Sequence, residues 1–225
     1  MGENRLVIDT GGKVGRVGLV VDGVVVRGVN LDSARRHARD LTPTIASLLA
    51  DAGLRVTQLA GVTVAVGPGS FTGLRVGIMA AKALAYAAGC ELVAVPTFHA
   101  IARQAPAAAA NLWVIADALQ GQVYLQRYAG GVAIEELRIV AADDWLPQAP
   151  ADAWFTGPGV AVYADKNIPQ SCTLVDESAR EATVESLYAV GAGMAALTRP
   201  ELFALEPLYL RGSSAEEAAK KRAGG

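Results

Sequence analysis

Val64-Ala-Val-Gly-Pro-Gly-Ser-Phe-Thr-Gly-Leu-Arg-Val-Gly77 joins a β-branched run to a helix-forming segment through a Gly-Pro-Gly turn. Glycine and proline supply the backbone freedom and the fixed φ of a tight turn, and Ser70 is a good N-cap for a helix that we expect to reach about residue 88. Such a strand–turn–helix unit points backbone N–H groups and the positive end of the helix dipole at the loop. The loop therefore suits either an anion or a backbone carbonyl.

Small residues recur every fourth position along that helix, so they line one face of it. They are Gly73, Gly77, Ala81, Ala85 and Gly89. A face with almost no side chains lets a neighbour approach closely. Because glycine in a helix costs about 1 kcal/mol relative to alanine, this pattern needs a reason, and close packing is one. The spacing leaves open whether the neighbour is a helix of another protein or part of the same domain.

Two common nucleotide motifs are excluded at this turn. The glycines at 67, 69 and 73 are spaced G-x-G-x-x-x-G, which is one residue too long for the dinucleotide fingerprint, and no Gly-Lys-Ser/Thr follows them.

The composition is that of a compact globular protein. The 225 residues are 52% apolar and 19% charged with a net charge of −2, which argues against general disorder and against a basic field that would attract nucleic acid. Two isolated cysteines indicate no disulfide framework, and no apolar run reaches the roughly 18 residues of a membrane span. His37 has Leu41 rather than histidine four residues on, so we expect no metal site. We expect a cytosolic protein.

The order of elements repeats along the chain. A short apolar strand ends in Asp9 in the first half and in Asp117 in the second, each followed by a hairpin pattern and later by a Gly-Pro-Gly turn. We therefore expect an α/β protein of two similar lobes, residues 1–105 and 106–225, divided at the linker around Pro106. A cleft between two such lobes is a common place for a site.

Asp9 lies beside a glycine-rich turn, where a carboxylate either helps to hold a metal–phosphate group or caps the turn. If the cleft takes a nucleotide or phosphate, its candidate contacts are Asp9, Thr10, Gly67, Gly69 and Ser70. The sequence leaves both roles open.

Residues 67–77 closely resemble the bacterial TsaB (YeaZ) family. The resemblance extends over nearly the whole chain, and it includes Ile8-Asp-Thr10, a helix with His37 and Pro43, Val95-Pro-Thr97, Asp117 through Tyr124, and Glu206-Pro-Leu-Tyr-Leu-Arg211. Two positions depart from the family motif Asp-Ala-Arg-x-Gly-Glu-Val-Tyr, because Leu119 replaces the arginine and Gln122 the glutamate.

The resemblance implies a two-lobed fold of the actin, Hsp70 and sugar-kinase (ASKHA) type with duplicated mixed-sheet lobes. It also implies a non-catalytic subunit that binds and activates TsaD, the enzyme that installs threonylcarbamoyl on adenosine 37 of tRNAs reading ANN codons. The expected contact is a helix bundle made by the first two helices of each protein, which fits the small-residue face. The expected interface residues of this chain are Gly73, Gly77, Ala81, Ala85, Arg75, His37 and Leu41.

The resemblance further implies assembly with the ATPase TsaE and a functional link to TsaC, which supplies threonylcarbamoyl-adenylate. The tRNA would be reached only through the complex. We expect no cofactor held by this chain alone, with ATP or ADP bound at the complex, and a homodimer of the isolated chain is compatible with this interpretation.

Two alternatives come from other classes of protein. Asp9-Thr-Gly-Gly-Lys13 with Arg16 looks like the first phosphate loop of glucokinase-like proteins, which would make the chain a stand-alone small-molecule kinase, although 225 residues leave little room for a sugar site. A metallopeptidase, a label long attached to this superfamily, would need a ligand pair such as His-Glu-x-x-His, which the sequence lacks.

Overall fold

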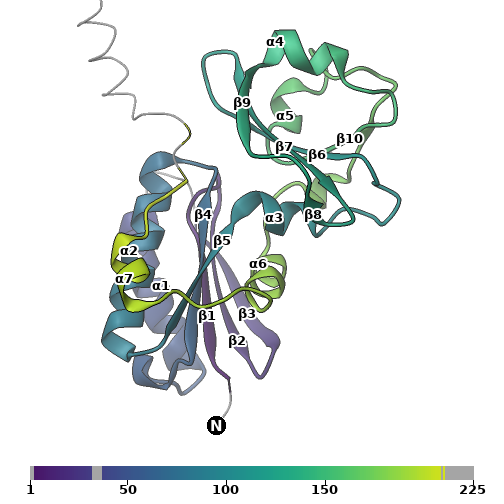
Figure 1. Ribbon diagram of the computed structural model, residues 1–225. Helices are drawn as coiled ribbons and strands as arrows, with labels where there is room; N and C mark the ends of the chain where they lie inside the picture. Colours follow the sequence, from purple (N-terminus) through teal and green to yellow (C-terminus); the bar gives the residue numbers. More distant parts are fainter. Residues whose placement is uncertain (1–2, 32–36, 209, 211–225) are drawn as a thin grey trace, which may run out of the picture.

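The computed structural model describes residues 3–31, 37–208 and 210. They form two lobes, each built on its own β-sheet, with the short helix α3 (Thr97–Ala102) at the junction between them (Figure 1). The expected α/β architecture with a mixed sheet in each lobe is confirmed.

The first sheet has the strand order β3-β2-β1-β4-β5. Its strands are β1 (Arg5–Asp9), β2 (Gly15–Val21), β3 (Val24–Leu31), β4 (Gly61–Gly67) and β5 (Glu91–Pro96). The first three are antiparallel neighbours, whereas β4 is parallel to both β1 and β5. Helix α2 (Phe71–Ala88) makes the crossover from β4 to β5. The Asp22-Gly23 turn between β2 and β3 has positive φ at both residues, as a tight hairpin requires.

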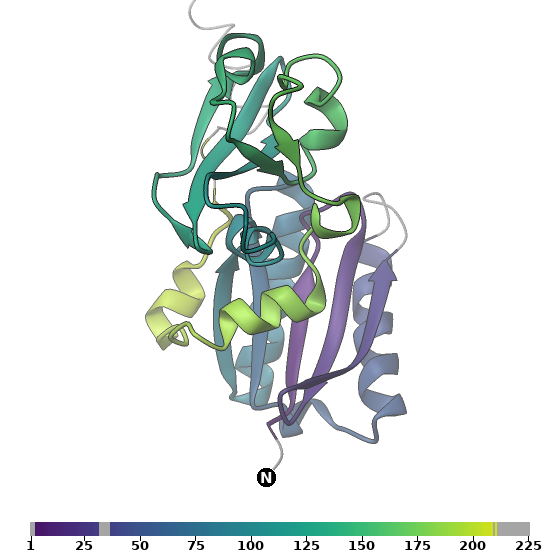
Figure 2. The same cartoon turned by 90° about the vertical axis from the view of Figure 1, so that its right-hand side faces the viewer.

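Helices cover both faces of this sheet. α1 (His37–Asp51) and α2 lie on one face, and α6 (Val184–Gly191) lies across the strands on the other (Figure 2). The alternation of side chains along β1 divides the core between these layers: Leu6 and Ile8 join the cluster under α1 and α2, whereas Val7 joins the cluster under α3 and α6.

The second lobe repeats the start of the first on a smaller scale. β6 (Leu112–Asp117) is antiparallel to β7 (Gln122–Ala129) and parallel to β10 (Trp154–Thr156), as β1 is to β2 and β4. The remaining elements of the lobe are β8 (Val132–Ala133), β9 (Arg138–Ala141), β11 (Thr173–Leu174), α4 (Ala142–Trp145) and α5 (Val160–Tyr163). Of the short 3₁₀ turns, η1 (Val56–Gln58) lies in the first lobe between α1 and β4. The turn η2 (Leu146–Gln148) lies in the second lobe, and η3 (Glu177–Ala179) follows its last strand.

The chain returns to the first lobe after β11, which corrects the expected boundaries. α6 packs on the first sheet, where the missing side chain of Gly18 leaves room for Val184: a Cβ on Gly18 would lie 2.2 Å from a Val184 methyl. α7 (Arg199–Ala204) packs beside α2 and adds Leu202 to the first core. The expected second lobe of residues 106–225 is therefore wrong from α6 onward, because an amphipathic pattern does not say which sheet a helix will cover.

Lys82 fixes α7 to α2. Its ammonium donates hydrogen bonds to the carbonyls of Phe203 (2.7 Å) and Leu205 (3.1 Å), at the C-terminal end of α7 where a cation also complements the helix dipole. We expect Lys82→Met to speed amide exchange in α7 about tenfold, corresponding to about 1.4 kcal/mol, because both carbonyls lose their donor. Hydrogen exchange followed by mass spectrometry measures this. Lys166→Met, at an exposed lysine of the second lobe, should leave α7 unchanged, and equal exchange in the two variants would show that Lys82 does not hold the helix.

Candidate functional site

A cavity of about 520 Å³ lies between the lobes. It is bounded by the loops that follow β1, β4 and β6, by α3 and by the segment that leads into α6. Its walls are largely apolar, with Phe71, Phe98 and Tyr124 among them. The charged residues that line it are Asp9, Lys13, Arg16, Asp117 and Glu181.

The Gly-Pro-Gly turn binds a backbone carbonyl of its own lobe. The N–H of Ser70 donates to the carbonyl of Gly11 at 2.8 Å, and the N–H of Gly67 donates to the hydroxyl of Thr97 at 3.2 Å. The approach to Gly11 needs glycine at position 69, since a Cβ there would lie 2.7 Å from the same carbonyl oxygen. Of the two partners that the sequence allowed for this loop, an anion or a carbonyl, the structure contains the carbonyl. Ser70 also accepts from the N–H of Gly73, which confirms it as the N-cap.

The candidate phosphate contacts do not form one site. Asp9, Gly69 and Ser70 line the cavity, but Thr10 and Gly67 are not among its lining residues. Asp9 is 2% exposed and accepts a hydrogen bond from the N–H of Gly11 at 2.8 Å, so it caps the turn. Thr10 faces α2, where its hydroxyl donates to the carbonyl of Gly73 at 2.7 Å. A phosphate held by all five residues is therefore not supported.

The small-residue face of α2 packs against its own lobe. Gly73, Gly77, Ala81 and Ala85 are all buried. A Cβ on Gly73 would lie 2.0 Å from the Thr10 carbonyl oxygen, and one on Gly77 would lie 2.2 Å from the Thr10 hydroxyl. The prediction that another protein's helix approaches this face is wrong. A four-residue spacing defines a face of a helix but not the neighbour that packs on it.

The structure gives a different result for each of the other expected interface residues, Leu41, Arg75 and His37. Leu41 is 1% exposed and belongs to the first core, so it is not available to a partner. Arg75 is exposed on α2, with its guanidinium 4.3 Å from the centre of the Phe71 ring. The side chain of His37 lies outside the described residues.

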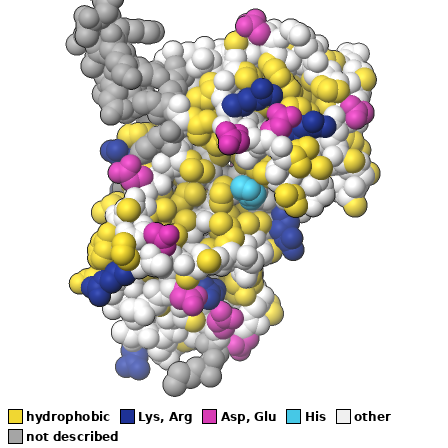
Figure 3. Space-filling model, in the orientation of Figure 1, with side chains coloured by type: hydrophobic (Ala, Val, Ile, Leu, Met, Phe, Trp, Pro, Cys, Tyr) yellow, Lys and Arg dark blue, Asp and Glu magenta, His cyan; other side chains and the backbone are white. Residues whose placement is uncertain are grey.

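The sequence reasoning overlooked the opposite face of α2, which is exposed. Its exposed residues are Thr72, Arg75, Met79, Ala83, Tyr86 and Ala87. Met79 is 62% and Tyr86 60% exposed, and Phe203 of α7 is 56% exposed with its ring edge-on to Tyr86 at 5.9 Å. Figure 3 shows hydrophobic side chains gathered over α2 and α7. We call Met79, Ala83, Tyr86 and Phe203 the outer apolar face; the three- and four-residue spacing of its α2 members was the signal that could have revealed it.

A family model described as "TsaD: tRNA N6-adenosine threonylcarbamoyltransferase" matches residues 29–218 of the chain. An uncharacterised protein of Mycobacterium tuberculosis is 34% identical over 93% of this chain and 90% of its own length. The TsaB protein of Bacillus subtilis, named for tRNA threonylcarbamoyladenosine biosynthesis, is 30% identical over 63% of each chain. The solved YeaZ structure from Pseudomonas aeruginosa superposes with a TM-score of 0.75 at 23% identity, covering 92% of this chain and all of that one.

The chain belongs to the TsaB (YeaZ) group of the TsaD family. The resemblance seen in the sequence is thereby confirmed, and the YeaZ superposition confirms the two-lobed fold that it implied.

The TsaB motif of the second lobe, residues 117–124, contains a strained turn that lines the cleft. Leu119, Gln120 and Gly121 all have positive φ, at 63°, 54° and 71°. A left-handed conformation costs leucine about 1–2 kcal/mol, yet Leu119 is 64% exposed and lines the cavity. The turn is held by Asp117, whose Oδ1 accepts from the N–H of Leu119 and from the hydroxyl of Tyr163, both at 2.9 Å. Leu119 thus brings an apolar side chain to the position where the TsaB motif carries arginine.

Tyr163 provides a pH-dependent test of this turn. Burial, the hydrogen bond to Asp117 and the negative charges of Asp117 and Asp143 raise the pKa of its phenol from about 10 to about 12. Because the unfolded chain loses this proton at lower pH than the folded protein, stability is full below pH 10 and falls as the pH rises towards 12. We expect Tyr163→Phe to lose less stability over that interval than the parent protein, as measured by thermal unfolding. Parallel pH profiles for the two proteins would show that Tyr163 is not buried against Asp117.

Within residues 3–31, 37–208 and 210, no group of three His, Cys, Asp or Glu side chains is placed to hold a metal ion. In that same part of the chain no helix has both the length and the apolar character needed to cross a membrane.

Proposed function

We propose that this chain is the non-catalytic subunit that binds and activates TsaD when threonylcarbamoyl is installed on adenosine 37 of tRNAs reading ANN codons. A role in the biosynthesis of threonylcarbamoyladenosine follows from the TsaB group, three members of which are named for that pathway. The finer role as a binding and activating subunit is argued from the exposed surface and from the cleft.

The family match indicates what kind of partner fits. This chain matches the TsaD family model over residues 29–218, and a TsaD transferase of Novosphingobium aromaticivorans is 46% identical over 63 residues, or 28% of this chain. A partner of that family would carry helices equivalent to α1 and α2. Two related folds can then pair through equivalent surfaces about an approximate two-fold axis, in the manner of an isologous dimer.

The observation that carries the proposal is the outer apolar face. Met79, Tyr86 and Phe203 are each more than half exposed, and together with Ala83 they occupy neighbouring positions on α2 and α7. Exposed apolar patches of this kind mark interaction sites in soluble proteins. Arg75, on the same side of α2, supplies a charged rim, and Arg199 lies with its guanidinium 5.6 Å from the centre of the Tyr86 ring. The proposed contact is thus moved from the buried small-residue face to the exposed face of the same helix.

The cleft supports an accessory rather than a catalytic role. The N–H groups of Gly67 and Ser70 are bonded within the chain, and the half-buried Arg16 is paired with Glu181. The proposal therefore gives this chain no cofactor of its own and assigns ATP or ADP to the assembled complex. It retains TsaE as a further partner, TsaC as the supplier of threonylcarbamoyl-adenylate, and contact with tRNA only through the complex.

The same contacts weigh against the stand-alone kinase. A kinase of the glucokinase type needs the glycine-rich loop after β1 to grip phosphate, but here the Gly11 carbonyl is held by Ser70 and the Asp9 carboxylate caps the turn. The comparisons with known proteins support the TsaB assignment and give the kinase no support.

A titration of the purified chain with purified TsaD from the same organism, followed by calorimetry, tests the proposal. We expect saturable binding with one chain per TsaD, together with loss of any homodimer that the isolated chain forms through the same face. Turnover of ATP by the chain alone with a panel of sugars, and no binding to TsaD, would overturn the proposal in favour of a kinase.

A further inference from the structure

Two segments connect the lobes. The first is the stretch from α3 to β6, residues 103–111, and the second is the stretch from β11 to α6, residues 175–183 (Figures 1 and 2). The second lies beside the cavity between the lobes, since Glu181 and Ala182 line it, and the first follows directly on α3, whose Ile101 lines it. The bonds that hold these segments therefore set how the lobes face each other.

The second connection begins firmly attached to the second lobe. The N–H of Val175 donates to the carbonyl of Phe155 at 2.9 Å, and the hydroxyl of Thr156 donates to the carbonyl of Ala179 at 3.2 Å. Arg180 donates from Nε to the carbonyl of Val175 at 2.8 Å. Residues 175–180 thus move with β10 and β11.

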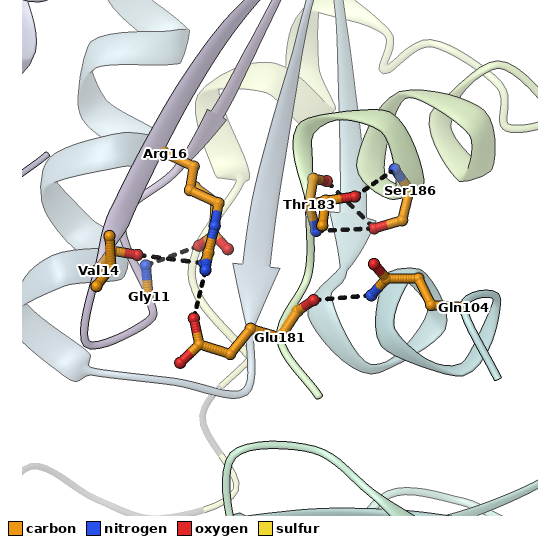
Figure 4. Close-up of polar contacts among 8 residues, drawn as sticks. Gly11, Val14, Arg16, Gln104, Glu181, Thr183 and Ser186 are labelled. Carbon is orange, nitrogen blue, oxygen red and sulfur yellow. Dashed lines mark hydrogen bonds and ion pairs between the residues drawn. The ribbon is translucent and has the colours of Figure 1, made fainter. Parts of the chain in front are cut away.

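One residue later the chain is attached to the first lobe (Figure 4). The carboxylate of Glu181 forms an ion pair with Arg16 of β2. Its carbonyl accepts a hydrogen bond of 2.7 Å from the Gln104 side chain, which follows α3 in the other connection. Thr183 and Ser186 then cap α6 on the first sheet. Glu181 is therefore the residue at which both connections and the first sheet meet.

The apolar contacts across the junction constrain the angle between the two lobes less than the bonds of Glu181 do. The cluster under α3 contains side chains of both lobes, among them Val95 of β5, Val114 of β6 and Tyr128 of β7. Burial of apolar surface holds the lobes together but is non-directional, so small rotations cost little. A hydrogen-bonded ion pair depends on distance and orientation, and this one is only partly exposed, at 17% for the Arg16 side chain and 35% for that of Glu181.

We propose that the second connection pivots between Arg180 and Glu181, and that the Arg16–Glu181 ion pair sets the resting angle between the lobes and so the width of the cleft. Glu181 acts here as a positioning residue. When the ion pair is intact, the lobes keep one relative orientation. When it is broken, they sample a wider range of angles between them. This inference does not depend on the proposed partner, because every bond in it lies within the chain.

Distances between one spin label on each lobe test the inference. In a background with Cys90→Ser and Cys172→Ser, labels are attached to cysteines introduced at Ala46 of α1 and Val162 of α5, which are both exposed. We expect a narrow distance distribution in this parent. Glu181→Gln and Arg16→Gln should each broaden the distribution and shift its mean, and the double variant should broaden it no further, because both changes break one interaction.

A matched control and a rescue make the result specific. Glu177→Gln makes the same change at an exposed position of the same connection and should leave the distribution as in the parent. The charge swap Arg16→Glu with Glu181→Arg should restore the narrow distribution. If Glu181→Gln fails to fold, Arg16→Gln removes the same pair from the other side. Distributions for the folded single variants that superpose on the parent, or additive broadening in the double variant, would overturn the inference.

Discussion

Gly77→Leu is expected to lower the melting temperature by about 10 °C, because the new side chain has no space on the buried face of α2. A Cβ at this position would lie 2.2 Å from the Thr10 hydroxyl and 3.4 Å from a methyl group of Ile8, and leucine adds three further carbons. Overpacking of a core costs about 1–3 kcal/mol, and displacing Thr10 from the carbonyl of Gly73 costs about 1 more. The gain in helix propensity, below 1 kcal/mol, does not offset this. Because the Cβ alone already lies at 2.2 Å, we take the upper end of the overpacking range, and the net loss of about 3 kcal/mol corresponds to the stated shift for a chain of this size.

Ala87→Leu provides the control for Gly77→Leu. It adds leucine to the exposed side of the same helix, where a surface change is worth within about 0.5 kcal/mol, so its melting temperature should match that of the parent. Calorimetry or circular dichroism on both variants gives the comparison. If Gly77→Leu has the melting temperature of the parent but no longer binds TsaD, the small-residue face is part of the TsaD interface. That result would contradict its packing inside the first lobe.

Met79→Arg is expected to weaken binding to TsaD about 100-fold while leaving the fold intact. Met79 is 62% exposed, so arginine meets no steric conflict in the free chain. In the proposed complex it would place a charge within the outer apolar face, and such a change inside an interface costs about 3 kcal/mol. The calorimetric titration proposed for the wild-type chain measures the loss directly.

The matched control is Val162→Arg. Val162 is 45% exposed on α5 of the second lobe, away from α2, so the same substitution there should leave the affinity for TsaD unchanged. Wild-type affinity in Met79→Arg, or an equal loss in both variants, would show that TsaD does not dock on the outer apolar face.

Features set by local chemistry could be predicted from the sequence. The turn at residues 67–69 and the Ser70 N-cap followed from the residue types alone, and so did the parallel pairing of β4 with β5 around α2. The strands ending in Asp9 and Asp117 likewise indicated two similar lobes. In each case the deciding interactions lie within a few residues or within one βαβ unit.

Features set by packing between distant segments could not be predicted in this way. Gly77 and Ala81 mark a close-packed face of α2, but only the tertiary structure shows that Thr10 occupies it. Val184 begins an amphipathic helix, yet nothing near it in the sequence shows that Gly18 leaves space for it on the first sheet. The outer apolar face was overlooked for the opposite reason, because exposed Met79 and Tyr86 look like ordinary core residues until their exposure is known.

Reconstitution of the tRNA modification tests the central claim most directly. TsaD, TsaC, TsaE, tRNA, threonine, bicarbonate and ATP are combined with or without this chain, and threonylcarbamoyladenosine is quantified in the digested tRNA. We predict that modification depends on the wild-type chain and that Met79→Arg fails to support it at concentrations where Val162→Arg does. Equal modification in the absence of the chain would contradict its role as the activating partner of TsaD.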